Sequence, residues 1–307
     1  MKFVIYLSLL LFALPSICQQ SLNAKLGYSE DAKLLIIHGD DMGVAHAQNE
    51  ASILAMKVGM VNSGSIMMAC PWVEEIAAFA RENKKADLGL HLTLTNEWYD
   101  YNWGPVASKD KVSSLVNENG FLHPDCLVFS QHAKVQETEI ELRAQIEKAI
   151  RMGINPTHFD AHMGCLIFSS AEMFEVYLKL GREYKVPVMV SRLFLKAASQ
   201  AFIDKMTDED IIIENAITAG PPDYEGGMDN YYTTVLNELD SGVSVLLIHL
   251  AFDNAEMQAI TRGQEYWGAR WRQQDFDFFT SEKCKRLLRE NDIHLITWRE
   301  IGEAIYK

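Results

Sequence analysis

Two adjacent carboxylates, Asp40 and Asp41, follow an apolar run at 33–38. Adjacent carboxylates that leave a strand repel each other unless a positive charge lies between them. A divalent cation would supply that charge, and the flanking Gly39 and Gly43 allow the backbone to turn both side chains toward one point. The other interpretation is that Asp41 caps a following helix while Asp40 stays solvated. The pair alone does not decide between the two.

The segment His158-Phe-Asp-Ala-His162 places its polar side chains on one face of a strand. With a rise of about 3.3 Å per residue, its two histidines lie about 13 Å apart, too far to bind one ion in regular geometry. We therefore expect only His162 to bind a metal ion. Asp160 and His158 should lie deeper and orient it or carry a catalytic hydrogen bond. A buried polar cluster without function is the alternative, but such a cluster is costly to build.

His91 lies in the alternating segment 88–94, where a lone histidine is more often a core residue than a ligand. Its significance comes from the combination with Asp41 and His162. One carboxylate and two imidazoles leave coordination positions open for water and substrate, as hydrolytic metal sites require. The sequence therefore predicts one divalent metal ion held by these three residues.

Strands alternating with helices would position these residues. Apolar runs and alternating segments predict strands at 33–38, 61–68, 88–94, 156–161, 186–191, 211–213, 243–249 and 293–296. Helical spacing predicts helices at 45–58, 72–82, 135–152, 171–184, 276–290 and from 299 onward. About seven or eight such units without a linker predict a single, irregular β/α barrel with a parallel sheet over residues 19–307. A doubly wound open sheet is the alternative.

In a β/α barrel the active site lies at the C-terminal ends of the strands. His249 ends the apolar strand 243–249 and should lie at the same edge as the two acids. The long stretch 95–129 interrupts the regular alternation and is rich in aromatic residues. These residues could stack on sugar rings or pack against one another, and the two interpretations are equally supported. They are Trp98, Tyr99, Tyr101 and Trp103.

The formal net charge of -14 comes from 28 Lys plus Arg against 42 Asp plus Glu. Such a surface repels phosphate backbones and anionic lipid, which argues against nucleic-acid and membrane-surface partners. A neutral or cationic small molecule is compatible, as is a homo-oligomer.

Residues 1–18 carry one lysine, a short apolar run and a small-residue end, which is typical of a secretory signal peptide. We therefore expect an exported, periplasmic or secreted protein without a membrane span in the mature chain. A lipid anchor on Cys18 is the less favoured alternative. The remaining cysteines show no paired spacing, which predicts buried free thiols and no disulfide. They are Cys70, Cys126, Cys165 and Cys284.

Several motifs, taken in order, resemble the YdjC-type (ChbG/HpnK-like) carbohydrate deacetylases. They are Asp40-Asp-Met-Gly43, Gly59-Met-Val-Asn-Ser63, Gly89-Leu-His-Leu-Thr-Leu-Thr95 and Pro156-Thr-His-Phe-Asp-Ala-His162. The resemblance covers most of residues 33 to 305. It departs from the family pattern at Ala161, where serine is usual, at Met163-Gly164, where further histidines are usual, and at Leu250, where proline is common. These departures concern the particular substrate rather than the ligand set.

The resemblance implies an irregular β/α barrel that cleaves an N-acetyl group from an amino sugar or oligosaccharide, with magnesium or zinc bound. Asp41, His91 and His162 match the family's metal-ligand positions. Asp40 matches the carboxylate proposed as general base, and His249 resembles a histidine that faces the site. His249, or with less support His158, would protonate the leaving amine. The alternatives are a metal hydrolase for another amide or ester, and a non-catalytic carbohydrate-binding barrel.

Overall fold

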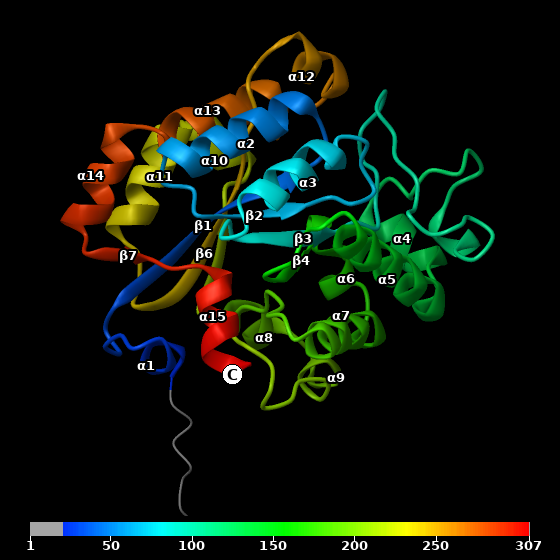
Figure 1. Ribbon diagram of the computed structural model, residues 1–307, viewed down its shortest axis with the longest axis horizontal. Coiled ribbons are helices and arrows are strands. Elements are labelled where there is room, and N and C mark those ends of the chain that lie inside the picture. The colour runs from blue at the N-terminus through cyan, green and yellow to red at the C-terminus, as the bar shows by residue number, and fades with distance from the viewer. Residues whose placement is uncertain (1–20, 307) are drawn as a thin grey trace, which may run out of the picture.

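The computed structural model describes residues 21–306, and the predicted signal peptide lies outside them. A parallel sheet occupies the centre and helices flank it on both sides (Figure 1). Its strands are β1 (Lys33–Met42), β2 (Ser63–Ile66), β3 (Leu88–Leu92), β4 (Phe159–Ala161), β5 (Asn215–Thr218), β6 (Gly242–His249) and β7 (Ile293–Leu295). The order is β4-β3-β2-β1-β6-β5, and β7 pairs with the first residues of β1.

The segment 186–191 links the two outer strands, β4 and β5, of this sheet. Phe159 in β4 donates its N–H to the carbonyl of Pro187 at 2.9 Å, and Met189 donates back to Phe159 at 3.0 Å. Further along, Ile213 donates its N–H to the carbonyl of Val190 at 3.0 Å, just before β5 begins. The sheet is therefore curled, and the predicted irregular α/β barrel with a parallel sheet is confirmed.

Helices connect the strands and cover the sheet. The longer ones are α2 (His46–Val58), α3 (Val73–Glu82), α5 (Val135–Arg151), α7 (Ala171–Tyr184), α11 (Met228–Asn237), α13 (Ala269–Phe279), α14 (Glu282–Glu290) and α15 (Trp298–Ile305). The shorter ones are α1 (Leu22–Lys25), α4 (Cys126–His132), α6 (Cys165–Phe168), α8 (Arg192–Ala197), α9 (Gln200–Ile203), α10 (Pro221–Gly226) and α12 (Ala255–Ile260). None of the helices within residues 21–306 has the length and apolar character needed to cross a membrane.

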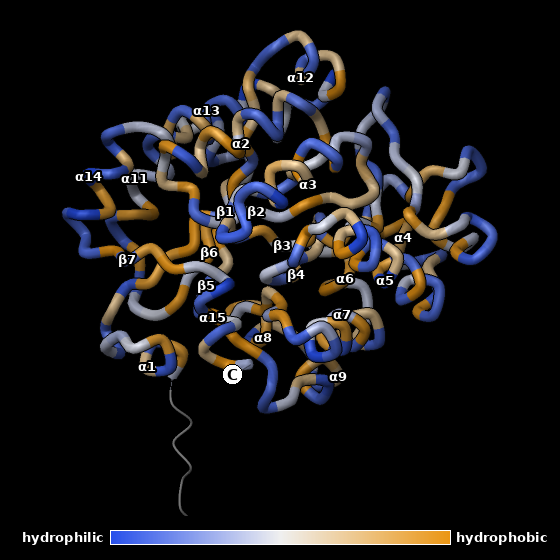
Figure 2. The backbone as a smooth tube through the Cα atoms, in the orientation of Figure 1, coloured by the Kyte–Doolittle hydropathy of each residue, from blue (hydrophilic) through white to orange (hydrophobic). Residues whose placement is uncertain are grey.

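The core lies between the sheet and the helices, and hydrophobic segments run through the central strands (Figure 2). All residues of β1 after Lys33 are buried. A strand covered on both faces is apolar throughout, which explains why the run at 33–38 was recognisable. The strand continues past that run to Met42, so Asp40 and Asp41 belong to the strand itself.

Three sequence predictions of secondary structure were wrong. The predicted helix 276–290 is two helices, because the Ser281 side chain accepts a hydrogen bond from the Cys284 N–H and caps a new helix. The segment 211–213 contributes a single bridge, and the strand lies at 215–218. This half-exposed strand contains Asn215 and Thr218 and lacks an apolar run. The predicted strand 186–191 pairs only through isolated bridges.

The prediction of four free thiols was also wrong. Cys126 and Cys165 form a disulfide whose Cα atoms are 4.9 Å apart. The two cysteines are 39 residues apart in sequence, and the fold brings α4 and α6 together, so spacing carried no signal. Cys70 and Cys284 are buried free thiols, as expected.

Candidate metal centre and active site

Asp41, His91 and His162 converge at the C-terminal ends of β1, β3 and β4. Each offers one ligand atom, all three atoms lie within 4.8 Å of one another, and all three residues are buried. Asp41 Oδ1 lies 3.5 Å from His91 Nε2 and 3.6 Å from His162 Nδ1. Residues far apart in sequence thus present one carboxylate and two imidazoles to one point.

The two oxygens of Asp41 have different surroundings. Oδ2 accepts a hydrogen bond from Arg272 Nη2 at 2.8 Å, whereas Oδ1 is buried without a hydrogen-bond partner among the described residues. Burial raises the pKa of Asp41, but the charge of Arg272 and the contact with His162 outweigh it and hold that pKa well below its usual range. A buried anionic oxygen without a donor that faces two imidazole nitrogens fits a divalent cation.

A local irregularity of β1 turns both carboxylates toward the site. The pairing of β1 with β2 shifts register between Gly39 and Met42, and Asp41 lies in the left-handed region with φ 64°. Such bulges redirect side chains that would otherwise alternate between the faces of a sheet. Helix α2 holds this backbone, because Gln48 donates its side-chain amide to the carbonyl of Asp40 at 2.7 Å.

Each imidazole of the set contacts a carboxylate through its other nitrogen. His91 Nδ1 lies 2.8 Å from Asp160 Oδ1, and His162 Nε2 lies 3.0 Å from Glu97 Oε2. Burial lowers the pKa of both rings, but the carboxylates outweigh it: Asp160 raises the pKa of His91, and Glu97 and Asp41 raise that of His162 to about 10. A carboxylate on the second nitrogen fixes the orientation of a metal-binding imidazole.

Asp40 lies beside this set with one oxygen engaged. Its Oδ1 accepts from Ser65 Oγ at 3.2 Å and lies 3.0 Å from His38 Nε2. Its Oδ2 is 4.0 Å from His249 Nε2, and the same nitrogen is 3.9 Å from Asp41 Oδ2. His249 therefore borders the same space. Burial lowers the pKa of His249, in part opposed by the charge of Asp41.

Comparison with known proteins places the chain in a family. The model of the family described as YdjC-like protein matches residues 34–290. The chain belongs to the YdjC-like family.

Among relatives of this YdjC-like protein, a carbohydrate deacetylase of Thermus thermophilus is 29% identical over 285 residues, which cover 89% of this chain and 96% of the relative. A carbohydrate deacetylase of Thermoanaerobacter pseudethanolicus is 24% identical, over 87% of this chain and 98% of the relative. A solved structure from Enterococcus faecalis, described as a proposed cellobiose-phosphate cleavage protein, covers 88% of this chain and 99% of its own. Its TM-score of 0.71 at 23% identity shows the shared fold.

His158 lies deeper in the YdjC-like barrel than the ligand set. Its Nδ1 is 3.0 Å from Thr157 Oγ1, and its ring stacks on Trp298 with centroids 5.2 Å apart. Burial lowers the pKa of His158 well below the usual value, which keeps the ring neutral. None of its hydrogen bonds reaches the ligand set, so this geometry gives no support to the alternative in which His158 protonates the leaving amine.

The four aromatic residues of the long loop divide into two groups. Trp98, Tyr101 and Trp103 pack on one another with centroids 5.6 to 6.2 Å apart, and both tryptophans are buried. The Tyr101 hydroxyl donates to the carbonyl of Val44 at 2.5 Å. The trio borders the site, because Trp103 lies 6.3 Å from the His162 ring and Trp98 lies 5.4 Å from the Arg272 guanidinium. These three residues pack against one another, which was one of the two interpretations of the sequence. Tyr99 is 80% exposed and is the member that offers a face to solvent.

Sequence reasoning missed three residues of the site: His38, Glu97 and Arg272. Glu97 lies in the irregular loop and Arg272 on α13, and no spacing connects either to the ligand motifs. His38 did carry a signal. It stands two residues before Asp40, and in a strand such a pair shares one face. The apolar run at 33–38 conceals this signal, because His38 stands at its end.

A well-formed cavity in the described residues lies away from this site. It measures about 800 Å³ and is lined by residues such as Asn62 and Asp87, which precede β2 and β3. It therefore opens at the N-terminal ends of the strands, opposite the candidate site. In β/α barrels that end contributes to stability, and chemistry takes place at the other.

Proposed function

We propose that this YdjC-like protein is a metal-dependent deacetylase that removes N-acetyl groups from amino sugars or their oligosaccharides. The observation that carries the proposal is the buried Asp41 Oδ1, which has no hydrogen-bond partner among residues 21–306 and faces the two imidazoles. The carboxylate of Asp40 lies beside it, with Oδ2 toward His249. The relatives named carbohydrate deacetylase, which align over nearly their whole length, support the same reaction.

In this proposal Asp41, His91 and His162 hold one magnesium or zinc ion, and the two nitrogen ligands favour zinc. When bound, the cation polarises the acetyl carbonyl and lowers the pKa of a water molecule. Arg272 and the carboxylates behind the imidazoles hold the three ligands in place before the ion arrives.

The chain's own residues then handle the protons. Asp40 Oδ2 accepts a proton from the attacking water, whose oxygen bonds to the acetyl carbon. The carbon–nitrogen bond breaks as the sugar nitrogen takes up a proton from the protonated form of His249, whose Nε2 borders the same space as Asp40 Oδ2. The proton held by Asp40 then passes to His249, which restores both residues. The products are acetate and a free amino sugar. Tyr99, the exposed aromatic residue near the site, would contact the sugar.

Export is part of the proposal. The predicted signal peptide motivates it, and the disulfide between Cys126 and Cys165 supports it, because such bonds persist in oxidising compartments such as the periplasm. Cell fractionation of the tagged chain, with and without residues 1–18, tests this step. Full-length protein that stays in the cytoplasm would contradict it.

Acetate release from N-acetylglucosamine and its oligomers, with zinc or magnesium added to chelator-treated protein, tests the activity. We expect release with at least one metal, and a loss of at least about 100-fold in Asp40→Asn, the range of general-base removal. Asp41→Asn should lose cation binding as well, whereas Asp40→Asn should keep it. Sugar binding without acetate release under any of these conditions would favour a carbohydrate-binding protein instead.

A further inference from the structure

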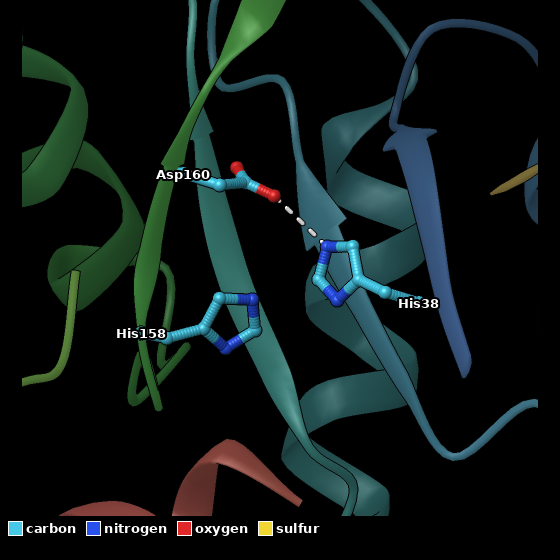
Figure 3. A group of neighbouring side chains, drawn as sticks. All are labelled: His38, His158 and Asp160. Atoms are coloured by element: carbon cyan, nitrogen blue, oxygen red, sulfur yellow. Dashed lines mark hydrogen bonds and ion pairs between the residues drawn. The ribbon is translucent and has the colours of Figure 1, made fainter. Parts of the chain in front are cut away.

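His38 is a fully buried histidine between two carboxylates. It extends from β1 toward Asp160 in β4 and toward His158, the residue that precedes this strand (Figure 3). Its Nε2 lies 2.9 Å from Asp160 Oδ2 and 3.0 Å from Asp40 Oδ1. Its Nδ1 lies 3.0 Å from Ser63 Oγ. Both ring nitrogens therefore have oxygen partners.

The charges around this ring require a proton on it. Asp40 and Asp160 are both buried, and two carboxylates near each other away from water are strongly unfavourable without a positive partner. A doubly protonated ring donates from Nε2 to the carboxylates and from Nδ1 to Ser63. Burial lowers the pKa of His38, but its contacts with Asp160 and Asp40 outweigh this and raise that pKa to about 10.

The carboxylates of Asp160 and Asp40 contact different parts of the site. Asp160 uses its other oxygen, Oδ1, to hold His91 Nδ1, which leaves His91 Nε2 toward Asp41. Asp40 has its Oδ1 occupied by His38 and Ser65, which leaves Oδ2 toward His249. One ring thus contacts the carboxylate behind a proposed metal ligand and the proposed base.

We propose that His38 is a positioning residue that ties Asp40 to Asp160, so that the proposed base and the ligand His91 are oriented together. This inference rests on the proposed function for the role of Asp40. His38 touches neither the ion nor the substrate in this scheme, and acts only through the two carboxylates.

A double-mutant cycle on the full chain tests the link to Asp40. His38→Gln keeps an amide donor but carries no charge. We expect kcat to fall about 10- to 100-fold with KM changed less than about twofold, because only the orientation of the base is lost. In the Asp40→Asn background the same change should alter kcat less than about threefold. His123→Gln, a buried histidine far from this cluster in sequence, is the control and should keep wild-type kcat.

A purely structural role would give a different result. Loss of folded protein lowers kcat by the same factor in both backgrounds, and that outcome would overturn the proposal. So would a His38→Gln variant with wild-type kcat. If His38→Gln does not fold, the wild-type chain still decides the matter through NMR of ¹⁵N-labelled histidine. The ring should remain doubly protonated at pH 8, and a neutral ring there would contradict the proposal.

Cation binding separates this inference from the proposed function. His38→Gln should weaken zinc binding about tenfold in the wild-type background and little in Asp160→Asn, since the effect passes through Asp160. Zinc binding can be measured even if the protein deacetylates no sugar. In that case the proposed function fails, and the inference about His38 can still be tested. Zinc stoichiometry must be one ion per chain. Two ions, falling to one in His38→Gln, would show a second cation in place of the proton and overturn the proposal.

Discussion

His91 and His162 both point one ring nitrogen toward Asp41 and the other toward a carboxylate, but they belong to different regions. His91 lies in β3, and its partner Asp160 lies in the adjacent strand β4 with a side chain that is 1% exposed. His162 follows β4 in a turn where Met163 has a φ of 54°, and its partner Glu97 comes from the long loop with a side chain that is 23% exposed.

The difference shows that the same imidazole–carboxylate contact can have two different strengths. On the strand side, the parallel ladder sets the backbone register between His91 and Asp160, and water is excluded from the pair. On the loop side, no ladder joins Glu97 to His162, and solvent reaches the carboxylate. Charge interactions weaken with solvent exposure and with salt. We therefore expect the strand-side carboxylate to matter more for binding a cation.

Asp160→Asn should give the largest effect. The amide removes the charge that both His91 and His38 contact, and its nitrogen faces a ring as a donor. We expect zinc affinity to fall about 100-fold, the upper end for residues that orient metal ligands. Calorimetric titration of chelator-treated protein at pH 9 measures it, with circular dichroism to verify the fold. If Asp160→Asn lost less zinc affinity than Glu97→Gln, the loop-side carboxylate would be the more important of the two.

Glu97→Gln should weaken zinc binding about tenfold at pH 9, because the partly exposed carboxylate is screened by solvent and the amide still offers an oxygen to His162. Raising the salt concentration should reduce the difference in zinc affinity between the wild type and Glu97→Gln. It should leave the difference between the wild type and Asp160→Asn almost unchanged. Equal salt sensitivity of the two variants would mean that burial does not distinguish the two regions.

Proton competition sharpens the comparison on the loop side. The pKa of His162 in the cation-free protein is raised to about 10, with Glu97 and Asp41 outweighing burial. Below that pH a proton occupies a ring that must be neutral to bind a cation, so wild-type zinc affinity should rise between pH 7 and pH 9. Glu97→Gln lowers the pKa of His162 and should show a shallower rise. The gap between the two proteins at pH 7 should be a few-fold smaller than at pH 9 by the same titration.

The same division explains what the sequence could predict. Asp41, His91 and His162 lie at or just after the ends of strands that apolar runs made recognisable, and the parallel fold then brings these ends together. Asp160 was readable because it shares a strand face with His162. The contact of Glu97 and the disulfide depend on how the 95–132 region packs against residues 162–165. Tertiary packing determines these contacts, because the contacting residues are 39 or more positions apart in the sequence. The local sequence pattern does not encode them.

The split of 276–290 into α13 and α14 has a related cause. Periodicity continues through Thr280 and Ser281, and only the competing hydrogen bond of the serine side chain ends one helix and starts the next. The first of the two helices also begins earlier than predicted, at Ala269, so Arg272 lies on it and its guanidinium contacts Asp41. Recognising Ser281 as a cap would have moved the helix, but the contact with Asp41 would still have required the fold.

The smallest effect on cation affinity is expected from the disulfide. Cys165 follows His162 by three residues, and its bond to Cys126 anchors this turn to α4. The double variant Cys126→Ser/Cys165→Ser should lose about 2–4 kcal/mol of unfolding free energy, typical of a native disulfide. Its zinc affinity should fall less than about threefold, because Glu97 still orients His162. Thermal unfolding with and without reductant provides the control, since reductant should lower the wild-type midpoint and leave the double variant unchanged. A tenfold loss of zinc affinity would show that the covalent bond, and not Glu97, holds the loop-side ligand.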